Sequence, residues 1–224
     1  MLIGLILQGG CKVTDPYYKE REKMIKYQME WRGIKDARVL EAIRKVPRHV
    51  FIPSSHSSLS YQDSPVPIGF GQTISQPYMV AYMTELLNLQ GIEKVLEIGT
   101  GCGYQTAILA ELSKVVFSIE IVKELCEISK KNLEILNYKN IGLRCGDGYF
   151  GWKEESPFDV ILVTAAPKKI PEALKEQLKI GGILVIPVGK EEQYLYVYKK
   201  TKAGFLEENK FRVVFVPMTG KIQD

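Results

Sequence analysis

The sequence has few of the residues that build metal sites and disulfide-bonded frameworks. Its 224 residues include two histidines, His49 and His56, and four cysteines, Cys11, Cys102, Cys126 and Cys145. No two cysteines have the C-x-x-C spacing that is typical of zinc sites and redox-active pairs. We therefore expect no bound metal and no disulfide framework. Scattered free thiols are typical of proteins in a reducing compartment.

The sequence also lacks a long apolar run and a strong excess of one charge. No apolar run approaches the roughly 20 residues that span a bilayer. The net charge is +4, and basic and acidic residues are interspersed along segments such as 123–134. Proteins that bind nucleic acid usually concentrate Lys and Arg on one surface. We expect a soluble monomer with neither a membrane nor a nucleic-acid partner.

The first residues leave two interpretations open. Met1–Leu7 is apolar and is followed by Gln-Gly-Gly-Cys11. This could be the end of a lipoprotein-type signal, with Cys11 as the lipidated residue and an extracytoplasmic location. A secretory signal, however, has a positively charged start and a longer apolar stretch, and both are missing here. The expectation is a cytoplasmic protein in which residues 1–16 form an N-terminal extension.

Residues 17–88 show helical periodicity followed by an irregular segment. A first apolar helical stretch leads to Gly33. Asp36–Lys45 has apolar residues at helical spacing and is followed by the helix-stopping Pro47. Residues 53–71 are rich in Pro, Ser and Gly, which predicts a long loop of the kind that tends to be functional or disordered. A further helix is predicted from about Gln76 to Leu87.

Residues 93–188 alternate between short apolar runs and helical stretches. Strands are predicted at Lys94–Ile98, Val115–Ile119, Gly142–Cys145, Val160–Thr164 and Ile183–Val188. Helices are predicted between them, near Gln105–Leu112, Val122–Leu136 and Lys169–Leu178. This order implies an α/β fold with a Rossmann-like, doubly wound and mostly parallel sheet. Two further strands, Tyr194–Tyr198 and Phe211–Val216, predict a C-terminal antiparallel hairpin joined by residues 201–210.

A glycine-rich turn joins the first of these strands to the helix that follows it. Gly99, Gly101 and Gly103 alternate with Thr100 and Cys102. Glycine lets the backbone turn sharply and approach a ligand closely, and the helix start adds unpaired N–H groups. The pattern G-x-G-x-G differs from the dinucleotide fingerprint G-x-G-x-x-G, and it lacks the Gly-Lys-Ser/Thr of a P-loop. Taken alone, it could also be a tight strand-to-helix turn.

Polar residues at the ends of the next strands narrow the interpretation. Glu120 ends the second strand, about 20 residues after the glycines, where a carboxylate can accept hydrogen bonds from both hydroxyls of a ribose. Asp147, between Gly146 and Gly148, follows the third strand, where small neighbours leave room for a flat ring; it could also be a simple turn former. Thr164 ends the fourth strand. Because ligands of open α/β sheets bind at the carboxyl ends of strands, these residues predict one site at that edge.

These motifs resemble those of the class I S-adenosylmethionine-dependent methyltransferases. Leu96–Gly103 (LEIGTGCG) is similar to their first motif, and Glu120 to their ribose-binding acid. Phe158–Leu162 (FDVIL) resembles their fourth-strand motif, and Leu178–Val185 (LKIGGILV) resembles the entry to their fifth strand. The resemblance implies S-adenosyl-L-methionine as the cofactor and S-adenosyl-L-homocysteine as the product.

A narrower resemblance covers nearly the whole chain, from about Met24 to Gly220. Pro67–Met79 (PIGFGQTISQPYM) is similar to the signature loop of the protein-L-isoaspartate O-methyltransferases, and its fixed order of Gly-x-Gly-Gln-Thr-Ile-Ser before Pro is highly specific. Phe70 stands where this family often has Tyr or Gln. Four further segments resemble the same family, namely Val46–Pro53, Gly99–Ala107, Thr164–Pro167 and Phe215–Gly220.

The resemblance implies a protein-repair activity. The enzyme would methylate the free α-carboxylate of L-isoaspartyl residues in damaged peptides and proteins, and the ester would convert through succinimide toward normal aspartate. Residues 17–88 would form the substrate side and residues 89–224 the cofactor-binding core. The implied substrate-binding residues are Gln72, Thr73, Ile74, Ser75, Tyr78 and Thr219, with Ser75 as the catalytic residue. The implied cofactor-binding residues are Thr73, Glu97, Gly99, Thr100, Gly101, Gly103, Gln105, Thr106, Glu120, Ile121, Asp147, Gly148 and Thr164.

The expected chemistry fits the residues that the sequence offers. A carboxylate has an ordinary pKa of about 4, so it is already ionised at neutral pH and needs no general base. The sequence correspondingly shows no clear Ser/His/Asp or Cys/His set. The hydroxyls and N–H groups of Thr73–Ser75 are suited to holding a carboxylate. Ser75 could also cap the helix that begins near Pro77, and both roles are compatible.

Three other functions share part of this pattern. A nucleic-acid methyltransferase usually carries a Pro-Pro-Tyr-type motif after the fourth strand to stack a flipped base. This chain has Thr164–Pro167 (TAAP) there, and the superficially similar Asp15–Tyr18 (DPYY) precedes the core. Only the Pro67–Met79 loop argues against a small-molecule methyltransferase. The third alternative is a nucleotide-binding module without enzymatic activity.

Overall fold

The computed structural model describes residues 15–220. The two interpretations of Met1–Cys11 concern residues outside this range. Within the range, no helix combines the length and the apolar character that a membrane crossing requires.

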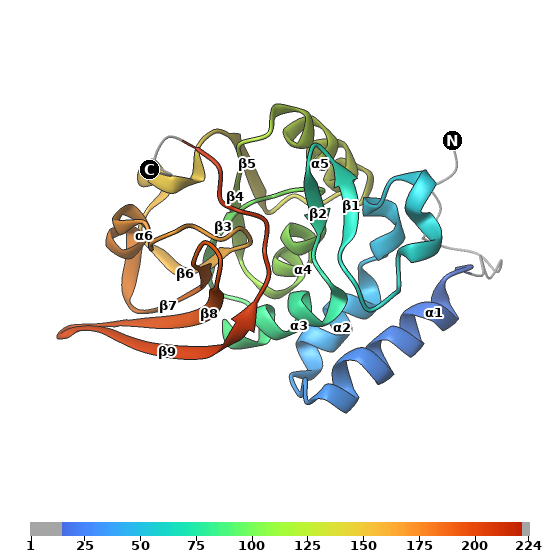
Figure 1. The fold of residues 1–224 in the computed structure, drawn as a ribbon, viewed down its shortest axis with the longest axis horizontal. Coiled ribbons are helices and arrows are strands. Elements are labelled where there is room, and N and C mark those ends of the chain that lie inside the picture. The colour runs from blue at the N-terminus through green and yellow to red at the C-terminus, as the bar shows by residue number, and fades with distance from the viewer. Residues whose placement is uncertain (1–14, 221–224) are drawn as a thin grey trace.

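The fold is built on a sheet with the strand order β5-β4-β3-β6-β7-β8-β9 (Figure 1). Its strands are β3 (Lys94–Ile98), β4 (Val115–Glu120), β5 (Ile141–Cys145), β6 (Phe158–Val163), β7 (Leu178–Val188), β8 (Gln193–Thr201) and β9 (Gly204–Val213). Neighbouring strands from β5 to β7 are parallel, whereas β8 and β9 are antiparallel to their neighbours. From β3 the chain adds β4 and β5 on one side of the sheet, and then returns to add β6 and β7 on the other side. This is the doubly wound arrangement. The predicted fold class is confirmed.

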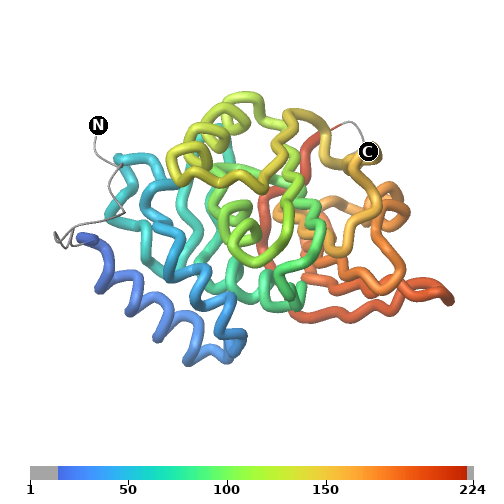
Figure 2. Tube along the Cα trace, turned by 180° about the vertical axis from the view of Figure 1, so that it is seen from behind, coloured from blue at the N-terminus to red at the C-terminus, as the bar shows by residue number. Residues whose placement is uncertain are grey.

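Helices pack on this sheet and build the N-terminal end of the molecule. The described α-helices are α1 (Tyr18–Lys23), α2 (Ala37–Lys45), α3 (Pro77–Leu86), α4 (Tyr104–Leu112), α5 (Lys123–Ile135) and α6 (Glu172–Gln177). A π-helical turn (Met24–Met29) and a 3-10 turn (Glu30–Arg32) continue α1 to Gly33. Further 3-10 turns lie at Arg48–Phe51, Ser54–Leu59, Gly148–Phe150 and Lys153–Glu155. Figures 1 and 2 show α1 at one end of the molecule and the β8–β9 hairpin extending at the other.

The central strands send alternate side chains into two buried clusters. In β3, Val95 joins the cluster that includes residues of α2, α3 and α4, while Leu96 joins the cluster that includes α6. Leu162 and Ile161 of β6 repeat this division. Both faces of the sheet are therefore dry, and for this reason the strands are near-continuous apolar runs in the sequence. The first cluster also contains residues from Met24 onward, so the N-terminal segment and the sheet share one apolar interior.

The C-terminal hairpin differs from its predicted boundaries. β8 continues to Thr201 and β9 already begins at Gly204, so the hairpin turns over two residues. The prediction of a connecting loop at 201–210 and a strand at Phe211–Val216 is therefore wrong. The polar side chains of β9 alternate poorly with apolar ones because this edge strand is mostly exposed, and apolar periodicity cannot mark it.

The long loop predicted at 53–71 is ordered by two local devices. Its first part is the 3-10 turn Ser54–Leu59. Its last part enters an antiparallel pair, β1 (Val66–Gly69) and β2 (Gln72–Ile74), which carries most of the signature loop (Figure 1). Gly69, Phe70 and Gly71 form the turn of this pair, and all three have positive φ.

Two cysteines form a disulfide, which corrects the expectation of scattered free thiols. Cys126 in α5 and Cys145 at the end of β5 are bonded, with their Cα atoms 5.9 Å apart. A sequence separation of 19 gives no local spacing signal, and the pair meets because α5 packs back onto β5. Cys102 is a buried free thiol, whereas Cys11 lies outside the described residues.

Candidate functional site

The glycine-rich turn lies between β3 and α4, at the carboxyl end of the sheet. Gly99, Gly101 and Gly103 have positive φ angles of 98°, 57° and 92°. A Cβ atom on Gly99 would lie 2.3 Å from Thr164 Oγ1, so this position has no room for a side chain. The Thr164 hydroxyl donates to the Gly99 carbonyl oxygen over 2.8 Å. The end of β6 thus fixes the turn against the sheet.

Glu120 reaches the same turn from the end of β4. Its Oε2 accepts a hydrogen bond from the Gly101 N–H over 2.7 Å, and its Oε1 accepts one from the Val122 N–H over 2.9 Å. Glu120 is 6% exposed and lines a pocket. Each carboxylate oxygen can accept a further hydrogen bond. The geometry therefore suits a ligand that presents two neighbouring hydroxyls.

Glu97 is a second carboxyl group, fully buried beneath the turn. Its Oε2 accepts hydrogen bonds from the hydroxyls of Thr106 (2.5 Å) and Ser118 (2.6 Å), and Ser118 in turn contacts the Thr100 hydroxyl at 2.6 Å. Burial raises the pKa of Glu97 to about 8, although the two hydroxyl hydrogen bonds act in the opposite direction. The sequence predicts Glu97 and Thr106 as cofactor contacts, but the structure places them behind the turn and not in the pocket lining.

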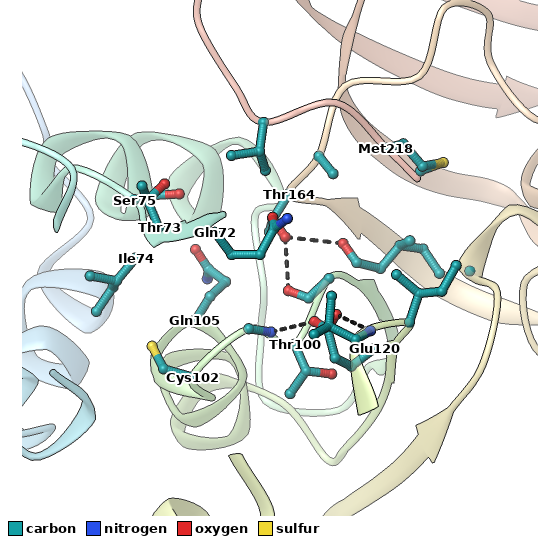
Figure 3. Close-up of a pocket in the computed structure, with 18 of the residues that line it drawn as sticks. Gln72, Thr73, Ile74, Ser75, Thr100, Cys102, Gln105, Glu120, Thr164 and Met218 are labelled. Atoms are coloured by element: carbon teal, nitrogen blue, oxygen red, sulfur yellow. Dashed lines mark hydrogen bonds between the residues drawn. The ribbon is translucent and has the colours of Figure 1, made fainter. Parts of the chain in front are cut away.

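The signature loop supplies the opposite wall. β2 carries Gln72, Thr73 and Ile74 to the pocket, and Ser75 follows directly. α3 begins at Pro77, with Gln76 at the N-cap position and no side-chain cap hydrogen bond. Ser75 is therefore not the cap of α3. Its side chain stands where the loop meets the pocket, as Figure 3 shows.

The C-terminal tail, which follows β9, covers the pocket at the carboxyl edge of the sheet. The Ala166 N–H donates to the Val216 carbonyl oxygen over 2.9 Å, and the Met218 N–H donates to the Ala166 carbonyl oxygen over 2.8 Å. The Gln193 side chain accepts from the Phe215 N–H and donates to the Phe215 carbonyl oxygen. The tail thus runs beside the segment after β6 instead of extending β9, as a strand at Phe211–Val216 would.

These elements enclose one pocket, in which the signature loop faces the glycine-rich turn (Figure 3). The predicted residues that line it are Gln72, Thr73, Ile74, Ser75, Gly99, Thr100, Gly101, Gln105, Glu120, Ile121, Gly148, Thr164 and Thr219. Glu120 is the one charged side chain among its described lining residues. Within residues 15–220, no three His, Cys, Asp or Glu side chains are grouped so that they could hold a metal ion.

Gly103 and Asp147 lie outside this lining. Gly103 is the N-cap residue of α4. Asp147 accepts a hydrogen bond from the Tyr149 N–H over 2.9 Å and so caps the 3-10 turn after β5. Its neighbour Gly148 does line the pocket. A direct cofactor contact by Gly103 or Asp147 stays a prediction.

The pocket also uses residues that the sequence argument did not assign to it. Most of them stand at strand ends or in the tail motif FVPMTG, and this position in the sequence is the signal that could have identified them. They are Val80, Ile98, Cys102, Tyr104, Ile119, Val122, Ala165, Val216, Pro217 and Met218.

A groove adjoins the pocket and shares Thr73, Ser75, Thr164 and Val216 with it. Tyr78, a predicted substrate-binding residue, lines this groove rather than the pocket. The Arg32 guanidinium lies 3.7 Å from the centre of the Tyr78 ring. A chain lying in the groove would therefore reach Ser75 from outside while a second ligand occupied the pocket.

Comparison with known proteins gives one consistent result. The family model described as protein-L-isoaspartate(D-aspartate) O-methyltransferase matches residues 19–223. A protein-L-isoaspartate O-methyltransferase of Dictyoglomus thermophilum is 54% identical over 211 residues, which cover 94% of this chain and 96% of the relative.

Two solved structures agree with this comparison. One is a protein-L-isoaspartate O-methyltransferase with a TM-score of 0.82 and 32% identity, over 89% of this chain and 66% of that longer chain. The other, from Plasmodium falciparum, bears the name of the same family and was solved in complex with S-adenosyl-L-homocysteine. It has a TM-score of 0.78 and 30% identity, over 89% of this chain and 98% of that one.

Proposed function

The chain belongs to the protein-L-isoaspartate(D-aspartate) O-methyltransferase family, and on this premise we propose how its pocket and groove carry out the reaction. The enzyme transfers a methyl group from S-adenosylmethionine to the free α-carboxylate of L-isoaspartyl residues in damaged peptides and proteins. The observation that carries the proposal is that Ser75 lies in the lining of both cavities, between Glu120 on one side and the open groove on the other.

The pocket suits the cofactor by the chemistry of its lining. The free acceptor capacity of Glu120 matches the two hydroxyls of the ribose. Gly99 and Gly101 bring the backbone close to the ligand, and the apolar Ile98, Ile119 and neighbouring side chains suit a flat ring. A single negative charge in the lining also suits a ligand whose sulfonium is positive.

The signature loop holds the acceptor. Thr73 and Ser75 offer hydroxyls beside the pocket, whose described lining contains no Lys or Arg side chain that would quench the nucleophilic oxygen of the acceptor. Tyr78 and the segment that follows β9 line the groove in which the flanking peptide would lie. We propose that residues 17–88 form the substrate side, with Phe211–Val216 adding a wall to the groove, and that residues 89–224 otherwise form the cofactor-binding core.

The reaction requires alignment rather than acid–base catalysis. When bound, S-adenosylmethionine supplies an electrophilic methyl group, so that an O–CH3 bond forms at the carboxylate while the S–CH3 bond breaks and its electron pair stays on sulfur. The two walls of the pocket hold the reactants in line and exclude water, which can lower a barrier by roughly 7–11 kcal/mol. The ester has a better leaving group than the carboxylate, so a backbone nitrogen closes the succinimide with loss of methanol. Hydrolysis of this ring gives normal aspartate in part.

The acceptor is a flexible peptide or an unfolded region, because the groove has to receive the chain on both sides of the isoaspartyl residue. The enzyme works as a monomer, since the residues of one chain complete both the pocket and the groove. It uses neither nucleic acid nor a membrane as a partner, and the mild net charge of +4 supports this view.

A methyl-transfer assay with radiolabelled cofactor tests the proposal. The acceptors are an isoaspartyl peptide, an RNA and a set of small carboxylic acids. Label should enter the isoaspartyl peptide alone. Label in RNA or in the small acids, with none in the peptide, would support one of the other methyltransferase classes.

A variant at Ser75 tests its role in the same assay. Ser75→Ala should lower the rate of peptide methylation by about tenfold or more, because a misplacement near 1 Å costs about a hundredfold in rate. It should leave the affinity for S-adenosylhomocysteine unchanged within about twofold, as measured by calorimetry. Ser54→Ala, at an exposed serine of the preceding turn, is the matched control. An unaltered rate in Ser75→Ala would remove Ser75 from the acceptor site.

A further inference from the structure

Arg48 is the largest side chain that is fully buried in the described residues. It lies in the 3-10 turn that follows α2 and reaches the loop that carries Ser75. Its Nη2 donates to the Ser75 carbonyl oxygen over 2.7 Å, and its Nε donates to the Ser60 carbonyl oxygen over 2.9 Å. The Tyr104 ring lies against the guanidinium, with its centre 5.0 Å from Cζ. Ser75 and Tyr104 both line the pocket.

Among the residues that the structure describes, no carboxylate pairs with the charge of Arg48. No ion pair of Arg48 occurs within residues 15–220, and its Nη1 makes no hydrogen bond there. Burial lowers the pKa of the guanidinium, but an arginine side chain is not deprotonated in proteins. Arg21, which is also mostly buried, is paired with Asp15.

Burying an unpaired charge costs free energy of folding. We therefore expect a partner that compensates the charge of Arg48. The pocket beside Ser75 is where the proposed acceptor, an anion, would bind. The attraction between two charges is stronger in a buried site than in water, because the surroundings screen it less. The acceptor carboxylate would therefore offset part of the cost of burying Arg48.

We propose that Arg48 is a positioning residue whose buried charge, held behind Ser75, makes the site select a carboxylate over a neutral acceptor group. The inference rests on the proposed function of this site and adds a source of its selectivity. Arg48 acts through the Ser75 peptide group and does not touch the acceptor, so it attracts the carboxylate without neutralising the attacking oxygen. Methylation removes the negative charge of the acceptor. The ester product therefore loses the attraction to Arg48, and a new carboxylate substrate displaces it from the site.

The test compares two ligands that differ in one charge. One is an isoaspartyl peptide with its free α-carboxylate, and the other is the same peptide with an α-carboxamide. In Arg48→Met, the affinity for the carboxylate peptide should fall on the order of tenfold, which corresponds to two unit charges roughly 12 Å apart at an effective dielectric constant of about 20. The affinity for the carboxamide peptide should change by less than about twofold. An equal loss for both peptides would show a structural role alone and would overturn the proposal.

Two matched variants separate charge from packing. Arg48→Lys keeps the charge and should retain most of the preference for the carboxylate. Arg21→Met removes the other buried arginine and should leave the preference unchanged. If wild type methylates the isoaspartyl peptide and Arg48→Met keeps the full preference, the role of Arg48 fails while the proposed function stands. If wild type methylates no isoaspartyl peptide, the proposed function fails.

A measurement on wild type keeps the proposal testable if Arg48→Met does not fold. Because the Arg48 charge is buried, the carboxylate preference should change by less than about twofold between 50 and 500 mM salt, over which exposed charges become strongly screened. If the preference falls about tenfold over that range, exposed charges cause it, namely Arg32 or Arg212 of the groove. That result would overturn the role of Arg48.

Discussion

Replacing Glu97 by glutamine should stabilise the protein, and the gain should grow with pH. Glu97 is fully buried, and burial raises its pKa from an ordinary value of 4.5 to about 8. The donors around it point to one oxygen, since Thr106 and Ser118 both donate to Oε2 while Oε1 has no partner in the described residues. The neutral acid suits this arrangement better than a buried carboxylate, because Oε2 can accept both hydrogen bonds as a carbonyl oxygen. Glutamine reproduces its shape without a titrating group, and its amide N–H2, like the acid O–H, lacks an acceptor among the described residues at every pH.

The sign and the size follow from proton linkage. Between pH 4.5 and pH 8 the folded state keeps the Glu97 proton that the unfolded state releases. The free energy of unfolding of the wild type therefore falls as pH rises, by about 1.4 kcal/mol per pH unit. The roughly 2.5 pH units between 4.5 and 7 correspond to about 3 kcal/mol. Below pH 4.5 the contribution vanishes, and above pH 8 it no longer changes.

Denaturant unfolding of wild type and Glu97→Gln from pH 5 to pH 8 measures this difference. The two proteins should have similar stability at pH 5, and the variant should be the more stable by about 3 kcal/mol at pH 7. Glu127→Gln, at an exposed position of α5, is the control for a change of net charge. The assignment of a buried neutral acid would be refuted by a difference in the free energy of unfolding that does not vary with pH. It would also be refuted if the wild type became the more stable of the two as pH rises.

Three further outcomes follow from the same contacts. Glu120→Ala should weaken S-adenosylhomocysteine binding by about 2–4 kcal/mol in calorimetry, because two charge-assisted hydrogen bonds are lost, and an unchanged affinity would remove Glu120 from the site. Cys126→Ser should lower the free energy of unfolding by about 3 kcal/mol, since the disulfide to Cys145 closes a loop of about 20 residues. Thiol titration of the denatured wild type should rise by two thiols after reduction, and no rise would contradict the disulfide. Methylation should persist in EDTA, and a loss that magnesium or zinc reverses would indicate a metal-dependent methyltransferase.

The site was predictable where its residues mark strand ends. The Lys94–Ile98 strand has the same bounds in sequence and structure, because a parallel strand with two dry faces is a short continuous apolar run. Glu120 follows from the rule that ligands bind at the carboxyl ends of strands. Ser75 was found through the resemblance of its loop, and the physical pattern alone left it open between a helix cap and an acceptor contact.

The parts that were missed depend on contacts between distant segments. Cys126 and Cys145 meet only when α5 packs on β5, and nothing in their spacing indicates it. The cover of the pocket comes from Val216 to Met218, whose hydrogen bonds to Ala166 form across about 50 residues of chain. β9 is an exposed edge strand without apolar alternation, so periodicity placed its start seven residues too late.

The relative rates for an isoaspartyl peptide and its aspartyl twin test the account most directly. A normal aspartyl residue carries its carboxylate one methylene further from the main chain, and a misplacement near 1 Å can cost about a hundredfold in rate. The pocket between the Thr73–Ser75 loop and the glycine-rich turn should therefore favour the isoaspartyl peptide in kcat/KM by about a hundredfold or more. Equal kcat/KM values for the two peptides would contradict the assignment of isoaspartyl repair to this site.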